Sequence, residues 1–119
     1  MKFAIQFILI LFTSLTAFSQ SVPFYGSWLG KIKTTGVELR IAFHISEKDG
    51  VVITKLDSPD QNSFGNSAHK TTITNDTIKI DIPLLGVKFD GVLKNEKLNG
   101  TFHQSGLDLP LEMERFDGV

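Results

Sequence analysis

Apolar and polar residues alternate along much of this chain, which is the pattern of half-buried β-strands. In residues 37–46 every odd-numbered position is apolar, and the positions between them are mostly polar. Residues 77–82 and 107–113 repeat this alternation. Beyond the N-terminal segment, no apolar stripe with a helical period extends over more than two turns. The pattern therefore predicts an all-β domain.

Short turn signals separate the alternating segments. Asp49-Gly50, Asn75-Asp76 and Ser105-Gly106 contain residues that tolerate a positive φ, as tight hairpins require. We expect about eight strands, at residues 26–33, 37–46, 51–56, 70–74, 77–82, 87–93, 98–104 and 107–113. Asn62–Ser67 is expected to be a polar loop. Because short turns join neighbours in space, the strands should form an antiparallel meander that closes as a small lipocalin-like barrel, with a β-sandwich as the alternative.

The inward side of the predicted strands is apolar throughout. A barrel of this size can be filled by its own side chains or can hold one small ligand. We expect a filled core. The alternative, a ligand cavity, would be lined by Leu39, Ile41, Phe43, Ile80, Phe89 and Leu109. Trp28 is expected to be a core aromatic or a plug for one barrel end, and Pro110, which lacks a backbone N–H, is expected at a sheet edge or a bulge.

The N-terminal segment has the features of a secretory signal peptide. Lys2 gives a positive start, residues 3–18 are almost wholly apolar, and Ala17-Phe18-Ser19 offers small residues to a signal peptidase. We expect residues 1–19 to be removed and residues 20–119 to form one domain, secreted or periplasmic in a bacterium and without membrane attachment. A retained anchor is the alternative, although the apolar run falls short of the roughly 20 residues that span a bilayer.

Composition narrows the chemistry that the chain could carry. It has no Cys, which excludes disulfides and thiolate metal sites. Its 12 Lys and Arg against 13 Asp and Glu give a net charge of −1 with no basic block, so nucleic acid is not expected as a partner. The spacing of His44, His69 and His103 matches no metal-ligand pattern. We therefore expect neither a metal nor a cofactor.

One polar segment, Asp57-Ser58-Pro59-Asp60-Gln61, is a candidate site. A serine beside an acid suggests a hydrolase nucleophile, but no Gly-x-Ser-x-Gly elbow leading into a helix surrounds it. The two carboxylates also suggest a calcium loop, yet the regular acidic spacing and the closing glutamate are missing. We therefore expect no catalytic residue. The five residues are either a binding loop or a polar turn whose Asp side chains cap backbone N–H groups.

The same segment is the most specific part of a resemblance to a known family. Together with Trp28-x-Gly30, the alternating residues 37–45 and Leu98-x-Gly100-x-Phe102-x-Gln104-x-Gly106, it is similar to the N-terminal β domain of secreted bacterial α/β-hydrolases of the esterase or serine-aminopeptidase kind. Arg115 matches a terminal arginine of that domain, whereas Phe102 stands where that domain has tryptophan. The resemblance covers residues 26–115.

The resemblance implies a secreted, non-catalytic accessory or binding domain, because the hydrolase domain that carries the catalytic residues is not part of this sequence. Its partner would be a hydrolase domain or a small apolar ligand. Two alternatives stay open. The chain could be a lipocalin-like carrier of an apolar ligand, or it could be a fragment or split part of a secreted hydrolase.

Overall fold

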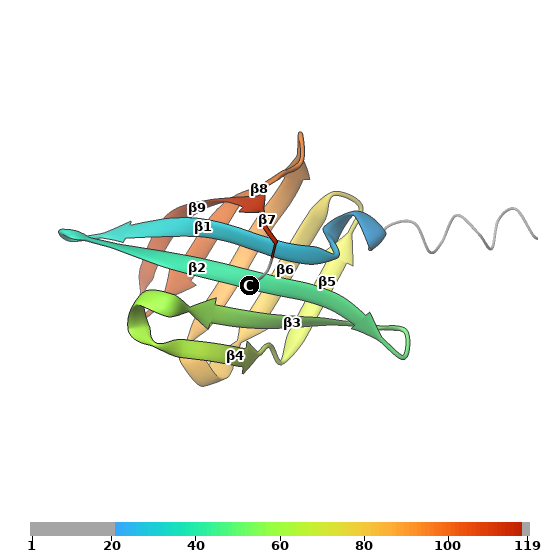
Figure 1. Ribbon diagram of the computed structural model, residues 1–119, viewed down its shortest axis with the longest axis horizontal. Coiled ribbons are helices and arrows are strands. Elements are labelled where there is room, and N and C mark those ends of the chain that lie inside the picture. Colours follow the sequence, from blue (N-terminus) through green and yellow to red (C-terminus); the bar gives the residue numbers. More distant parts are fainter. Residues whose placement is uncertain (1–20, 118–119) are drawn as a thin grey trace, which may run out of the picture.

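The computed structural model describes residues 21–117, which contain nine β-strands, three short 3₁₀ helices and no α-helix (Figure 1). The strands are β1 (Gly26–Thr34), β2 (Val37–Lys48), β3 (Val51–Ser58), β4 (Ser63–Ser67), β5 (Lys70–Thr74), β6 (Thr77–Ile82), β7 (Val87–Lys94), β8 (Lys97–Gln104) and β9 (Leu107–Arg115). The helices are η1 (Val22–Phe24), η2 (Pro59–Gln61) and η3 (Pro83–Leu85). None of these described helices has the length and apolar character needed to cross a membrane. The all-β prediction is confirmed.

All nine strands belong to one antiparallel sheet that curls into a half-barrel (Figure 1). The strand order is β4-β3-β2-β1-β9-β8-β7-β6-β5, so β1 pairs with both β2 and β9. Every other pairing joins strands that follow one another in the sequence, as short turns require. The predicted barrel-like meander is therefore confirmed.

The two outermost strands, β4 and β5, are separated only by Ala68 and His69. The amide of Ala68 donates to the carbonyl of Thr54 in β3 at 2.9 Å, and the amide of His69 donates to the carbonyl of Asp81 in β6 at 2.9 Å. Thr71 Oγ1 also donates to Thr54 Oγ1 at 2.8 Å. The chain thus passes from one margin of the sheet to the other, and these bonds hold the two margins together.

The loop predicted at Asn62–Ser67 is wrong over most of its length, because Ser63–Ser67 form β4. β4 is a polar strand whose register against β3 shifts near Leu56, and Gly65 has a positive φ of 66°. The side-chain amide of Asn66 donates to the carbonyl of Leu56 at 3.1 Å. Since a strand held in this way needs no buried side chains, it shows no apolar alternation in the sequence.

The concave side of the sheet holds the apolar core. Its buried side chains are Phe24, Trp28, Ile32, Ile41, Phe43, Ile45, Leu56, Ile78, Ile80, Ile82, Val87, Phe89, Leu98, Phe102, Leu111 and Met113. The rings of Phe43 and Phe89 meet across the interior with their centroids 5.2 Å apart. Four of the six residues expected around a ligand cavity, Ile41, Phe43, Ile80 and Phe89, are at most 2% exposed. This packing favours the filled core over a cavity.

Trp28 is buried and joins the core to the N-terminal helix η1. Its indole Nε1 donates to the carbonyl of Phe24 at 2.9 Å. The guanidinium carbon of Arg115 lies 4.3 Å from the centroid of the Trp28 ring, a cation–π distance. Arg115 also donates to the carbonyls of Tyr25 (2.8 Å) and Pro23. The prediction of a core aromatic is confirmed, and Arg115 ties the last strand to η1.

Pairing between β1 and β9 covers only residues 28–30 and 113–115. The same register, if continued, would place Lys33 opposite Pro110. Pro110 pairs with Thr101 of β8, but on its β1 side the described sheet gives it no partner. Because proline cannot donate a ladder hydrogen bond, the two strands separate before they reach it. β9 is not an edge strand, since it lies between β1 and β8, but Pro110 lies where the pairing of β9 with β1 is missing.

Candidate functional site

The predicted binding loop ends β3 and turns the chain into β4. Asp57 and Ser58 are the last residues of β3, Pro59–Gln61 form η2, and Asn62 ends the helix in the left-handed conformation with φ 53°. Proline suits the first position of such a helix because its φ is already fixed and its missing N–H is not needed there. The turn is therefore determined by local sequence.

Asp60 bonds this loop to β2. Its carboxylate accepts hydrogen bonds from Arg40 Nη2 at 2.8 Å and from the backbone N–H of Arg40 at 2.8 Å. The side-chain hydrogen bond from Arg40 holds the pKa of Asp60 below its usual value, and the same bond raises the pKa of Arg40. Pairing of β2 with β3 begins only at Ala42. Asp60 thus satisfies an amide that the sheet would leave unpaired.

Ser58 is buried, with 4% of its surface exposed, and its Oγ donates to Gln61 Oε1 at 2.8 Å. No described histidine contacts it: His44 bonds to Asp57, and His103 bonds to Asp90 and Asp108. A hydroxyl that is buried and already donating to an amide oxygen is poorly placed to attack a substrate. The bond instead closes η2 onto the strand that precedes it.

Asp57 holds both neighbouring strands with its two carboxylate oxygens. Oδ1 accepts from the amide of Gly65 in β4 at 2.7 Å, and Oδ2 lies 2.8 Å from Nε2 of His44 in β2. Asp57, Ser58, Asp60 and Gln61, the polar side chains of the predicted loop, thus all have hydrogen-bond partners within the domain. The turn interpretation, in which the Asp side chains bond backbone N–H groups, agrees with these contacts.

The connection from β6 to β7 repeats the geometry of this loop with different side chains. Ser58 and Ile82, the residues before each proline, have φ and ψ of −124° and 84° and of −126° and 77°. The helices η2 and η3 then end at left-handed Asn62 and Gly86. Because β3 and β6 run in the same direction through the sheet, both helices lie at one end of the half-barrel, which we term the η2 end. The repetition indicates a structural turn.

The structure also assembles a row of side chains that the sequence analysis did not find. Ser27 Oγ lies 2.8 Å from His44 Nδ1, and His44 Nε2 in turn contacts Asp57. Ser27 and His44 are directly opposite in the β1–β2 register, and Asp57 lies on β3 beside them. The sequence pattern contains part of this information, since all three side chains occupy outward positions of the alternating strands. Finding the row required both registers, which the Thr35-Gly36 turn sets between β1 and β2 and the Asp49-Gly50 turn sets between β2 and β3.

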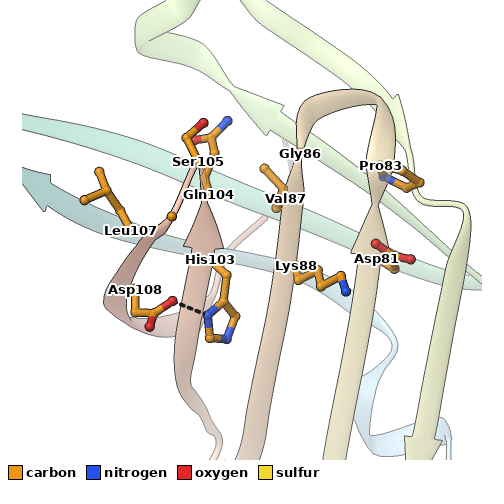
Figure 2. Close-up of a pocket in the computed structure, with 11 residues that line it drawn as sticks. Asp81, Pro83, Gly86, Val87, Lys88, His103, Gln104, Ser105, Leu107 and Asp108 are labelled. Carbon is orange, nitrogen blue, oxygen red and sulfur yellow. Dashed lines mark hydrogen bonds and ion pairs between the residues drawn. The ribbon is translucent and has the colours of Figure 1, made fainter.

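A second histidine lies beside a groove of about 520 Å³ over the ends of β6–β9 (Figure 2). His103 Nδ1 is 2.6 Å from Asp108 Oδ1, and its Nε2 is 3.1 Å from Asp90 Oδ2. The hydrogen bond to Asp108 is the main cause that raises the pKa of His103, and Asp90 adds to it. Both ring nitrogens are engaged by carboxylates. His103 therefore acts as an ionic link between β7, β8 and β9.

Within residues 21–117, no three His, Asp or Glu side chains are placed to hold one metal ion. A comparison of the chain with protein-family models, curated proteins and solved structures found no match. The resemblance to the N-terminal domain of α/β-hydrolases therefore rests on the quoted residues alone. The predicted signal peptide, residues 1–19, lies outside the described residues.

Proposed function

We propose that this chain is a secreted accessory domain that acts by binding, as its resemblance to the N-terminal domain of α/β-hydrolases implies. The observation that carries the proposal is the state of the Asp57–Gln61 loop. Its polar side chains bond to β2, to β4 and to one another, so the loop is a structural turn that supports a binding scaffold.

The filled interior favours a partner that binds to the outside of the half-barrel. Phe43 and Phe89 occupy the centre that an apolar ligand would need. The partner that best fits the resemblance is a separate α/β-hydrolase domain. A lipocalin-like carrier would require these rings to move apart, and it is the weaker candidate.

The surface proposed for this partner is the η2 end. Phe64 lies three residues after Gln61, near the start of β4, and is 60% exposed although it lies within a strand. Leu84 of η3, at the same end, is 85% exposed. Aromatic side chains are enriched in protein interfaces, which makes the exposed Phe64 the expected anchor.

Binding can be measured by calorimetry with the isolated α/β-hydrolase domain of a secreted esterase that normally carries such an N-terminal domain. We expect a complex that Phe64→Ser weakens at least about tenfold, which is 1.4 kcal/mol. Val51→Ser is the matched control, because Val51 is 62% exposed and lies in the hairpin at the opposite end. Absence of a complex, or equal weakening by the two substitutions, would contradict the proposal.

A further inference from the structure

The outer face of β1, β2 and β3 carries a hydrogen-bonded row that shares only Asp57 with the loop on which the proposed binding function rests. Ser27 Oγ and His44 Nδ1 are 2.8 Å apart, and His44 Nε2 and Asp57 Oδ2 are 2.8 Å apart. We propose that Ser27 is a nucleophile, activated by His44, that accepts short acyl groups from activated esters. Asp57 is the positioning residue. This activity goes beyond the binding function and does not depend on it.

The chemistry of the row fixes the position of the protons. An ionised carboxylate can only accept a hydrogen bond, so the proton of a neutral His44 is on Nε2, facing Asp57. Nδ1 then has a free lone pair and accepts the hydroxyl proton of Ser27. This is the arrangement that activates serine in a Ser-His-Asp triad, with the roles of the two ring nitrogens exchanged.

The sheet holds the three side chains in place, and Asp57 and His44 each make one further contact. Ser27 is paired in register with His44, and the second oxygen of Asp57 accepts the amide of Gly65 at 2.7 Å. The ring of Phe116 lies beside the imidazole, with the centroids 5.9 Å apart. Because strands supply all three groups, little reorganisation is needed for proton transfer.

A hollow of about 240 Å³ adjoins Ser27 and gives a substrate access to it. Its walls are Gly26, Ser27, Arg115, Phe116 and Asp117. The guanidinium of Arg115 packs over the Trp28 ring and donates to the carbonyls of Tyr25 and Pro23, so it lies on the face of β1 opposite to Ser27. The hollow is large enough for an acyl group of a few carbons.

The proposed step balances without any cofactor. Ser27 Oγ attacks the ester carbonyl carbon and its proton passes to His44 Nδ1, while Asp57 stabilises the resulting imidazolium. The bond to the leaving alkoxide or phenolate then breaks, and the proton on Nδ1 goes to the leaving oxygen. The product is an acyl ester of Ser27, which solvent water hydrolyses by the same sequence of transfers.

A fluorophosphonate tests the nucleophile directly, because it forms a stable phosphonyl ester on an activated serine and releases fluoride. We expect intact-mass analysis to show one adduct and peptide mapping to place it on Ser27. Ser27→Ala should abolish the adduct, and His44→Gln should slow its formation at least about 100-fold, the size of a typical general-base contribution. His103→Gln is the matched control and should leave the rate unchanged, since His103 is also held by carboxylates but has no serine partner.

Asp57→Asn separates positioning from folding. Asparagine keeps the shape of the side chain and can still accept the Gly65 amide, but its NH₂ group would donate to Nε2 and move the imidazole proton to Nδ1. We expect labelling to be lost while the urea unfolding midpoint changes little. Two results would overturn the proposal: no adduct while a known serine hydrolase reacts in parallel, or an adduct that survives Ser27→Ala. Either result would leave the binding proposal intact.

Discussion

The contact between Gly91 and Phe89 gives the sharpest prediction about the core. A Cβ added at Gly91 would lie 2.6 and 2.7 Å from Cε2 and Cζ of the Phe89 ring. Gly91 does not have a positive φ, so alanine there carries no backbone strain and would otherwise stabilise the strand by about 0.5–1 kcal/mol. Overpacking a core costs about 1–3 kcal/mol. The cost of the ring contact should exceed the gain in the strand, and we expect Gly91→Ala to destabilise the domain by about 1 kcal/mol.

Urea unfolding measures this effect conveniently, because Trp28 is the single tryptophan and is buried in the same core. A loss of about 1 kcal/mol corresponds to a decrease of about 4–8 °C in Tm for a domain of this size. In a Phe89→Leu background the clashing ring atoms are gone, so Gly91→Ala should become neutral or stabilising. The double-mutant cycle should therefore give a coupling energy of about 1–2 kcal/mol.

Gly100→Ala is the contrasting substitution. Its Cβ would lie 2.0 Å from the carbonyl oxygen of Asp90 and 2.7 Å from Cα of Gly91, which are backbone atoms that cannot rotate away. We expect a loss above about 3 kcal/mol, the upper end of overpacking costs, and no rescue by Phe89→Leu. Two results would refute this packing of the interior. One is that Gly91→Ala in the wild-type background does not change the stability, and the other is that Phe89→Leu rescues both alanine substitutions equally.

The other predictions concern the charged links between strands. The pKa of Asp60 is lowered in the folded protein. Asp60→Asn should therefore lower Tm fully above pH 3.8, the usual pKa, and the difference from the wild type should disappear as the pH falls through the lowered pKa. Tm measured against pH checks this. The pKa of His103 is raised above 6.5. Asp108→Asn should therefore destabilise the domain fully below pH 6.5, and the difference from the wild type should vanish as the pH rises through the raised pKa. NMR titration of the His103 ring can locate that pKa. Arg115→Ala should cost about 1–2 kcal/mol and speed hydrogen exchange at the Trp28 indole, and unchanged exchange would argue against the cation–π contact.

Much of the fold could be predicted because its signals are local. Alternation over residues 37–46 required a strand with one buried face, and Asp49-Gly50 required a hairpin after it. Pro110 indicated a place where strand pairing is interrupted, and the structure has such a place between β9 and β1. β4 could not be predicted, since Ser63–Ser67 bury no side chain and are held by the Asn66 side chain and by Asp57.

The sequence by itself determined eight of the nine strands, the turns between them and which of their side chains face inward, because these depend on neighbours within a few positions. It also singled out Asp57–Gln61 as polar and turn-forming. Only the tertiary structure decided what those residues contact: Asp60 meets Arg40 and Asp57 meets His44, each from another strand. It alone paired Ser27, rather than Ser58, with a histidine. Such contacts depend on the registers of β1 with β2 and of β2 with β3, which place side chains 13 to 20 residues apart in the chain next to one another.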